Sequence, residues 1–517
     1  MGILTGRFAL TAVVAAALLA PAAPVASAAP PIPAASPAAE SGLVQPAASA
    51  KWSDCWEGGT PEKARCTWVT VPRDWAEPTT SGTFKIRVAR IPATGPRLGV
   101  LTFNPGGPGG SGIELTELVY DLLPAQVRRS FDFVSWDPRG VGRSQPDLRA
   151  CTWEEPKLPR TGPVDVAAVA QTWHDAVAQA NQECLRRNQA VADYLGTWQV
   201  IRDLDAIRES LGVSRISLWG MSYGTTIGRA YAQAFPTRVR ALVLDGAIDP
   251  APSIHSYMRE HIWDDATAVQ RMLAAFGGGY VKTYDRAMRY LEQRTLRFAN
   301  GYRLDRWSFL YSMIGAAPRQ GSWPDAVELL DDVRRALDSA QARTAERGAR
   351  VAALVEAAES PDPLAPRAPR AESSFGFLLP LVNCADMPDR PTAETLARAG
   401  EQAMGVGGTP YLLPVLIEGA QCSGLPTLGR ALPGLHTVLR LSPRPVVVNS
   451  VADNATPYLG ARELANAFGS APMVVYDGTQ HVSYGRTSAC IDAPVTRYLL
   501  TLQLPPRSTA CPLVWER

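Results

Sequence analysis

The chain has 517 residues, of which 46% are hydrophobic and 19% are charged. A chain of this size and composition can bury a sizeable core, which excludes a small disulfide-stabilised scaffold or a single binding module. Its 51 Lys and Arg residues nearly balance 49 Asp and Glu residues, and the formal net charge is +2. Because a nucleic-acid-binding surface needs a clustered excess of cationic side chains, this balance argues against a nucleic-acid partner.

The first 28 residues have the pattern of a secretory signal peptide. Arg7 precedes an apolar run from Phe8 to Ala20, and the segment ends in the small residues Ala26-Ser27-Ala28. The run is shorter than the roughly 20 residues that a membrane-spanning helix needs. We therefore expect cleavage near Ala28, export of the mature chain and no stable membrane anchor.

Residues 29–50 are mostly Ala, Pro and Ser. A segment of this composition cannot bury enough apolar surface to offset the conformational entropy lost on folding. We expect a disordered leader or propeptide here, followed by a folded domain that begins near residue 51.

Export makes the eight cysteines informative, because disulfides persist in oxidising compartments. None of the cysteines forms a C-x-x-C pair and none has a His neighbour at metal-ligand spacing, so we expect no metal and no cofactor. An even count favours four disulfides, although eight cysteines allow 105 connectivities. The simplest pairing joins sequence neighbours: Cys55–Cys66, Cys151–Cys184, Cys384–Cys422 and Cys490–Cys511.

From residue 67 to residue 250, apolar strands alternate with amphipathic helices. Continuous apolar strands separated by helices are typical of a parallel sheet that is covered on both faces. The expected helices are 197–211 and 225–234, and the expected strands are 67–71, 83–91, 98–103, 131–136, 214–218 and 241–244.

A long segment without strands interrupts this alternation. Its expected helices are 267–276, 284–298, 323–337 and 342–358. The strand pattern returns at 445–449, followed by a helix at 458–468 and a strand at 473–476. The sequence therefore predicts one α/β domain in two parts, 51–250 and 436–517, with a mainly helical cap inserted at 251–435.

The pentapeptide Gly220-Met221-Ser222-Tyr223-Gly224 lies between an expected strand and an expected helix. It has the G-x-S-x-G pattern of a nucleophile elbow, whose sharp turn exposes the serine Oγ above the carboxyl end of the sheet. The pattern alone is a weak signal, since chance matches are common. The strand before it and the helix after it make Ser222 the predicted nucleophile.

A serine nucleophile needs a base, and this type of elbow takes an acid and then a histidine from later in the chain. Only His481 lies in the required place, because the other four histidines lie at or before residue 436: His174, His255, His261 and His436. His481 is therefore the predicted base.

The acid should follow the strand that returns at 445–449, and Asp453 has this position. Its expected task is to orient the imidazole and to stabilise the imidazolium. Alternatives for the acid are Asp245, Asp249 and Asp477.

The oxyanion that forms during acyl transfer needs preorganised backbone donors. We expect one donor to be the N–H of Tyr223, directly after the nucleophile. The second should come from the glycine-rich loop at 104–112, where Gly107 is the first candidate and Gly106 the second, because glycine lets the backbone approach a substrate. A phosphate-binding loop is the alternative, but the G-K-[ST] ending of that motif is missing.

Together these motifs resemble secreted α/β-hydrolase aminopeptidases of the tripeptidyl aminopeptidase group, which are related to proline iminopeptidases. The resemblance is carried by His481 and by the runs NPGGPGGSG (104–112), WDPRGVGRS (136–144), GMSYGT (220–225), LDGAIDP (244–250) and DNATPY (453–458). It implies an α/β-hydrolase fold and catalytic roles for Ser222, Asp453 and His481. Two departures stand out: Gln480 where the family usually has Gly, and Asn454-Ala455 where it usually has Pro and Val.

An aminopeptidase also needs an acid that pairs with the substrate ammonium, because a buried unpaired charge is costly. Three acids flank the apolar stretch 375–382 of the insertion: Asp386, which we favour, Glu372 and Asp389. A solvated or helix-capping acid is the alternative for each.

We therefore expect a monomeric, exported serine exopeptidase whose partners are peptides with a free amino terminus. It would release short peptides or single residues from that terminus. An esterase, lipase or thioesterase that uses the same three residues is one alternative. A non-catalytic secreted binding protein on a hydrolase scaffold is another, which the complete set of catalytic residues disfavours.

Overall fold

The computed structural model describes residues 51–55, 63–149, 151, 156–251, 253–298, 302–338, 375–387, 389–435 and 437–514. The expected signal peptide and leader lie outside the described residues, as do Glu372, His436 and the expected helix at 342–358.

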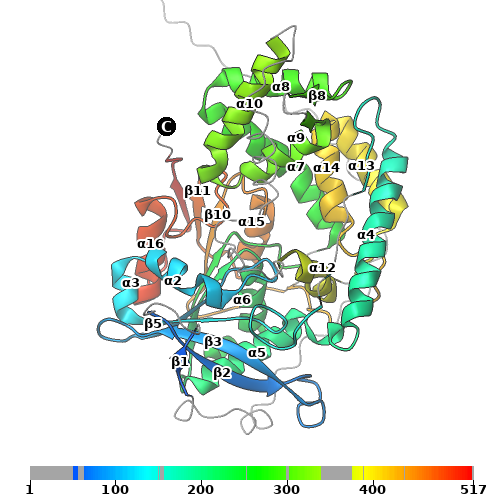
Figure 1. Cartoon of the computed structure of the whole chain (residues 1–517). Coiled ribbons are helices and arrows are strands. Elements are labelled where there is room, and N and C mark those ends of the chain that lie inside the picture. Colours follow the sequence, from blue (N-terminus) through cyan, green and yellow to red (C-terminus); the bar gives the residue numbers. More distant parts are fainter. Residues whose placement is uncertain are drawn as a thin grey trace, which may run out of the picture.

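A ten-stranded sheet runs through the domain that holds the predicted catalytic residues (Figure 1), in the order β1-β2-β3-β5-β4-β6-β7-β10-β11-β12. Neighbours from β5 to β12 pair in parallel, whereas the β1–β2, β2–β3 and β3–β5 pairs are antiparallel. The strands are β1 (Ser53–Asp54), β2 (Arg65–Pro72), β3 (Thr83–Ile91), β4 (Gly99–Asn104), β5 (Phe131–Trp136), β6 (Ile216–Met221), β7 (Val239–Asp245), β10 (Val446–Ser450), β11 (Met473–Tyr476) and β12 (Ser508–Cys511).

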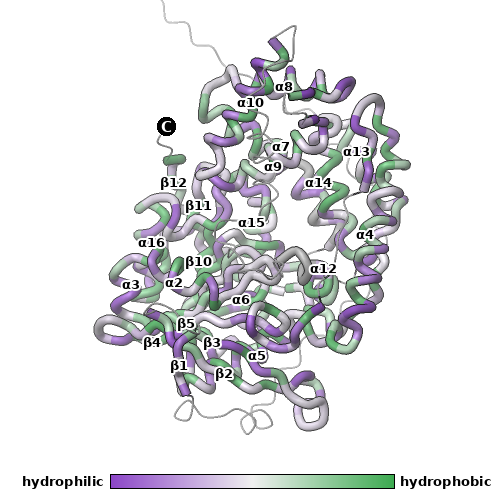
Figure 2. Tube along the Cα trace, in the orientation of Figure 1, coloured by the Kyte–Doolittle hydropathy of each residue, from purple (hydrophilic) through white to green (hydrophobic). Residues whose placement is uncertain are grey.

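The central strands are mostly apolar and are buried along their whole length because helices cover both faces of the sheet. Every residue of β5, β6, β10 and β11 is buried, and the tube around β10 is coloured hydrophobic in Figure 2. One face packs against α2 (Gly112–Leu122), α3 (Ala125–Ser130) and α16 (Ala489–Thr501). The other packs against α5 (Thr197–Ser210), α6 (Tyr223–Ala234) and α15 (Tyr458–Ala467).

The insertion after β7 forms a helical cap, which Figure 1 shows on one side of the sheet. Its core is continuous with the one that α5 and α6 cover, since both belong to a single cluster of buried apolar residues. The cap contains a short hairpin, β8 (Leu296–Arg297) and β9 (Arg303–Leu304), and the helices α7 (Ile254–Ala275), α8 (Gly278–Leu291), α9 (Arg306–Ala316), α10 (Trp323–Asp338), α12 (Phe375–Asp386), α13 (Ala393–Gly407) and α14 (Thr409–Gly419).

One helix from outside the insertion also packs against the cap. Helix α4 (Val166–Asn188) precedes β6 in the chain, yet it packs along α13 and contacts α14. The side-by-side placement of α4 and α13 is visible in Figure 1. The cap is therefore built from two segments of the chain, 166–188 and the insertion, and a division at residue 250 alone does not delimit it.

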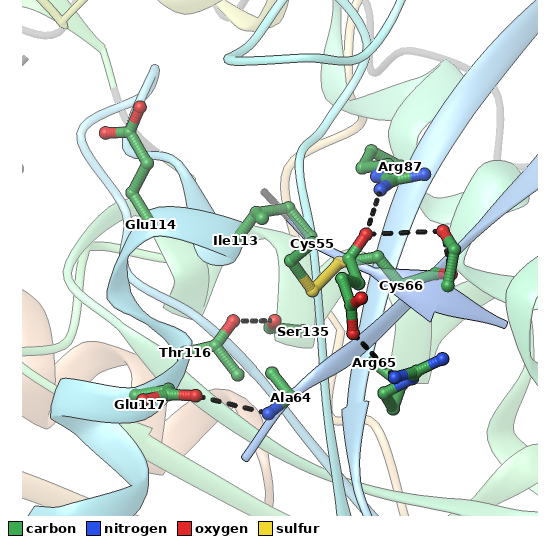
Figure 3. Close-up of a disulfide and its surroundings, with 12 residues drawn as sticks. Cys55, Ala64, Arg65, Cys66, Arg87, Ile113, Glu114, Thr116, Glu117 and Ser135 are labelled. Atoms are coloured by element: carbon green, nitrogen blue, oxygen red, sulfur yellow. Dashed lines mark hydrogen bonds and ion pairs between the residues drawn. A yellow bond between two sulfur atoms is a disulfide. The ribbon is translucent and has the colours of Figure 1, made fainter. Parts of the chain in front are cut away.

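The eight cysteines form four disulfides between sequence neighbours: Cys55–Cys66, Cys151–Cys184, Cys384–Cys422 and Cys490–Cys511. Figure 3 shows the first of them, at the edge of the sheet where β1 pairs with β2. The last joins α16 to β12 and so fastens the final strand. Among the described helices, none has the length and the apolar composition that crossing a membrane requires.

Candidate active site

Ser222 lies at the sharp turn between β6 and α6, with backbone angles φ 54° and ψ −124°. A positive φ costs a non-glycine residue of the order of 1–3 kcal/mol, so the surrounding structure must hold the turn. The Ser222 N–H donates to the carbonyl oxygen of Asp245 at the end of β7 (2.9 Å). A Cβ on Gly220 would lie 2.2 Å from the carbonyl oxygen of Gly224, so only glycine lets strand and helix approach this closely. The turn has the expected elbow geometry.

Asp453 and His481 form a hydrogen-bonded pair. Asp453 follows β10 and is fully buried, and His481 lies in the loop after β11. The Nδ1 atom of His481 is 2.9 Å from Oδ2 and 3.1 Å from Oδ1 of Asp453. A carboxylate in this position holds the proton on Nδ1, which makes Nε2 the basic nitrogen of the ring.

Further hydrogen bonds hold the Asp453 carboxylate in place. Its Oδ1 accepts from the backbone N–H groups of Ala455 and Thr456, each at 3.0 Å, and its Oδ2 accepts from the Thr456 hydroxyl at 2.9 Å. The Thr456 hydroxyl is also 3.3 Å from Nδ1 of His481. The sequence prediction did not include Thr456, although the D-x-x-T spacing is typical of such a turn.

Asp245, an alternative for the acid, joins the two parts of the site. Its backbone carbonyl accepts from Ser222, while its buried carboxylate accepts from the N–H groups of Ser483 and Tyr484, each at 2.9 Å. These two residues lie two and three positions after His481, in the loop after β11. Asp245 therefore fastens the His481 loop to the elbow.

The other two alternative acids bond elsewhere. Asp477 forms an exposed ion pair with Arg271 (2.7 Å), and Asp249 accepts from the N–H of Ala251. Asp453 is the carboxylate that hydrogen-bonds the His481 ring.

Burial raises the pKa of Asp245 to about 6. A carboxyl group whose pKa is higher in the folded than in the unfolded protein binds its proton more tightly in the folded state. The contribution of Asp245 to stability therefore declines as pH rises from about 4 to about 6. We expect Asp245→Asn to remove this decline. The unfolding free energy of the wild type minus that of the variant should fall by about 2 kcal/mol between pH 4 and pH 7, because each pKa unit corresponds to about 1.4 kcal/mol and the unfolded carboxyl is already partly ionised at pH 4.

Urea unfolding of both proteins at several pH values measures this difference. Acids that are present in both proteins cancel in the subtraction. If the difference in unfolding free energy stayed constant across the pH range, the raised pKa of Asp245 would be contradicted.

The glycine-rich loop lies against the elbow. A Cβ on Gly106 would be 2.5 Å from the carbonyl oxygen of Met221 and 2.8 Å from the backbone nitrogen of Tyr223, and φ at Gly106 is +88°. The Gly106 N–H donates to Oδ1 of Asn104 (2.9 Å). The next amide, that of Gly107, is therefore the better candidate for the second oxyanion donor, beside the Tyr223 N–H in the first turn of α6.

The cap contacts the His481 loop directly. The His481 N–H donates to the carbonyl oxygen of Pro318 in the cap (3.0 Å). The Gln480 side chain accepts from the N–H of Gln320 (3.2 Å) and donates to the carbonyl oxygen of His481 (2.7 Å). Asn454 likewise donates to Asp265 of α7 (2.6 Å). Two departures from the family pattern, Gln480 and Asn454, are thus residues that bond to the cap.

Two of the acids predicted to bind the substrate ammonium, Asp386 and Asp389, differ in their burial. Asp386 is 6% exposed, and both of its carboxylate oxygens already accept hydrogen bonds from the protein, from the Thr197 N–H and the Tyr223 hydroxyl. This leaves it poorly suited to receive an ammonium group. Asp389 is partly exposed.

Helix α7 carries three further acids, buried or partly buried, which the sequence prediction did not include. Burial raises the pKa of Glu260 to about 8, of Asp265 to about 7 and of Asp264 to about 6. Oε1 of Glu260 has no hydrogen-bond partner among the described residues, and the Arg259 guanidinium is 3.8 Å away, beyond hydrogen-bond distance. The negative charge of Asp453 contributes to the raised pKa of Asp264, which places this face of α7 close to the Asp453 loop.

Comparison with known proteins agrees with the fold. Residues 99–327 match a family model described as alpha/beta hydrolase fold, and residues 409–511 match one described as TAP-like protein. The first span contains Ser222, and the second contains Asp453 and His481.

Relatives with curated names cover nearly the whole chain. Tripeptidyl aminopeptidase of Streptomyces lividans is 31% identical over 485 residues, which covers 90% of this chain and 87% of that protein. Serine protease Hip1 of Mycobacterium tuberculosis is 29% identical over 92% of each chain, and carboxylesterase B of the same species is 31% identical over 90% of each. The chain therefore belongs to the tripeptidyl aminopeptidase group of α/β-hydrolases and is a serine peptidase.

Proposed function

We propose that the chain is an exported aminopeptidase that releases short peptides from free amino termini, with Ser222 as nucleophile, His481 as base and Asp453 as the orienting acid. The observation that carries this proposal is the hydrogen-bonded pair of the buried Asp453 and the partly buried His481, in a loop that Asp245 fastens to the Ser222 elbow. The four disulfides support export, because they are stable in oxidising compartments.

The proposed reaction is acyl transfer in two steps. Ser222 Oγ attacks the scissile carbonyl while Nε2 of His481 takes its proton, and the Tyr223 and Gly107 N–H groups stabilise the oxyanion. The imidazolium returns the proton to the leaving amine, which frees the carboxyl-terminal part of the substrate. Water then attacks the acyl-enzyme with the same base, and the amino-terminal peptide leaves as a carboxylic acid.

An aminopeptidase must also recognise the substrate ammonium, and Glu260 is the best-suited acid among the described residues. Its carboxylate is 6% exposed, and an oxygen atom of that carboxylate has no hydrogen-bond partner there. An ammonium group would supply the missing donor and would bring a positive charge within hydrogen-bond distance, closer than Arg259 at 3.8 Å. We therefore place the amino terminus of the substrate at this face of α7.

A panel of mono-, di- and tripeptidyl anilides, each with a free and with a blocked amine, tests the proposed function. We expect turnover of the free-amine substrates and little or none of the blocked ones. The relative named carboxylesterase B favours a second candidate, an esterase that uses the same residues. Cleavage of short acyl esters without any anilide cleavage would support that candidate and refute the exopeptidase.

Glu260→Gln is expected to raise KM for free-amine anilides by about 10- to 100-fold, because the amide keeps the shape but removes the charge that pairs with ammonium. The KM for a short acyl ester should stay the same. The matched control is Asp332→Asn in α10, an acid that is also 6% exposed and also has an oxygen atom without a partner among the described residues. Equal effects of the two variants on anilides would contradict the role of Glu260.

A further inference from the structure

Asp386 is the last residue of α12 in the cap, but its carboxylate bonds to residues of the hydrolase domain. Oδ1 accepts from the backbone N–H of Thr197 (2.9 Å), and Oδ2 accepts from the hydroxyl of Tyr223. The hydroxyl of Thr197 bonds to the same Tyr223 hydroxyl. Through Asp386, the cap reaches the residue that directly follows Ser222.

This carboxylate also caps a helix from a distant part of the chain. Thr197 is the first residue of α5, and the N-cap residue Gly196 has no side chain that could satisfy the first N–H groups. Asp386 supplies the missing oxygen from 189 residues away. A carboxylate is favoured at a helix N-terminus, since the macrodipole is positive there.

A negative charge on Asp386 is also unfavourable at this position, for two reasons. Asp386 ends α12, where the macrodipole disfavours a negative charge, and burial raises its pKa. The buried Arg229 balances part of this charge: burial lowers the pKa of Arg229 to about 10, while Asp386 acts in the opposite direction. The hydrogen bonds from Thr197 and Tyr223 to Asp386 offset part of these costs.

We propose that Asp386 is a positioning residue for acyl transfer, which holds the Tyr223 side chain and thereby fixes the Tyr223 backbone N–H at the developing oxyanion. Tyr223 is bonded at both ends: its backbone follows Ser222 in the elbow, and its hydroxyl is bonded by Asp386 and Thr197. Release of the hydroxyl would let the ring and the first turn of α6 move. The cap would then affect the rate of the chemical step in addition to the choice of substrate.

The proposal rests on the proposed mechanism and differs from an ammonium-binding role for Asp386. An amide at this position can still accept from the Thr197 N–H and can donate to the Tyr223 hydroxyl, whose proton then turns to Thr197 Oγ1. Asp386→Asn should therefore recover most of the activity that Asp386→Ala loses. If the residue bound ammonium, the charge would be essential and the two variants would be equally impaired.

The experiment measures kcat and KM for Asp386→Ala, Asp386→Asn, Tyr223→Phe and the Asp386→Ala/Tyr223→Phe double variant, with a free-amine anilide and with a short acyl ester. Active enzyme is counted by fluorophosphonate labelling of the serine. We expect Asp386→Ala to lower kcat by roughly 10- to 100-fold on both substrates, less than the 10²–10³ that removal of an oxyanion donor costs. KM should change by less than about threefold, and the double variant should be no worse than the poorer single variant.

Binding of a peptidyl boronate, which mimics the tetrahedral intermediate, provides a readout that a merely structural role would not move. Its dissociation constant should rise by the same factor by which kcat falls. The matched control is Asp305→Ala: Asp305 is also 6% exposed and caps α9 through the Trp307 and Ser308 N–H groups, without contact to the elbow. This control should lower the unfolding temperature but leave kcat unchanged.

Three results would overturn the proposal: a loss confined to KM on free-amine substrates, equal impairment of the Asn and Ala variants, or unchanged boronate binding in Asp386→Ala. If Asp386→Ala does not fold, Tyr223→Phe still tests the role of the Asp386–Tyr223 contact, because this variant removes only one hydroxyl group. Failure of the exopeptidase function would show instead in the wild type, as turnover of the ester without turnover of the anilide. The effect of Asp386 would then still be measured on the ester.

Discussion

Ser222→Ala is expected to lower kcat by about a million-fold, because removal of the nucleophile leaves only the binding groups and the oxyanion donors to act. The fold should persist, since alanine keeps the Cβ and the backbone bond from Ser222 to Asp245 holds the turn. Steady-state turnover of an anilide, together with loss of fluorophosphonate labelling, measures the change.

The thermal unfolding temperature of the Ser222→Ala variant serves as its control and should lie within a few degrees of the wild-type value. Residual turnover above about 1% of the wild type, by a protein that no longer takes the label, would refute the serine mechanism.

Asp453→Asn is expected to lower kcat by roughly 10⁴-fold through the tautomer of His481. Oδ1 of Asp453 accepts from two backbone N–H groups, so the amide nitrogen of an asparagine would take the place of Oδ2. It would then face Nδ1 of His481 as a donor and force the ring proton onto Nε2. In that tautomer Nε2 can no longer accept the proton of the serine.

Kinetics on one anilide, with the downfield imidazole proton signal in NMR spectra, measures the effect of Asp453→Asn. That signal should be present in the wild type and absent from the variant. Asp477→Asn is the control, because Asp477 is an acid of the same region whose carboxylate pairs with Arg271 at the surface. A variant at Asp453 that retains more than about a tenth of the wild-type kcat would show that another acid orients the histidine.

The sequence was most informative where a local pattern determines the structure. Strands β5 and β11 have the bounds expected from sequence, 131–136 and 473–476, because each is a short apolar run that ends at a turn. Strand β12 was not predicted: its sequence STAC is short and mostly exposed, and the neighbouring strand and a disulfide hold it in the sheet. Helix α4 lies before the insertion in sequence, so its packing against the cap could not be predicted from chain order.

In the candidate site, too, some features follow from local sequence patterns and others depend on tertiary contacts. The order of motifs along the chain was enough to predict Ser222, Asp453 and His481 as the catalytic residues. The contacts of Asp386 were not accessible in this way, because its partner Tyr223 lies 163 residues away and the bond depends on how the cap folds back. The sequence showed that acids flank an apolar stretch of the insertion, but what Asp386 bonds is a property of the tertiary structure.

The pairing of β7 with β10 has a consequence for how the enzyme is made. Val243 and Leu244 pair with Val446 and Val447, so about two hundred residues separate adjacent strands in the middle of the sheet. During synthesis Ser222 leaves the ribosome long before Asp453 and His481 do, and until then the edge of β7 that faces away from β6 has no partner strand. With the proposed catalytic residues, a growing chain would carry its serine without its base, and we expect peptidase activity only after the last strands have joined the sheet.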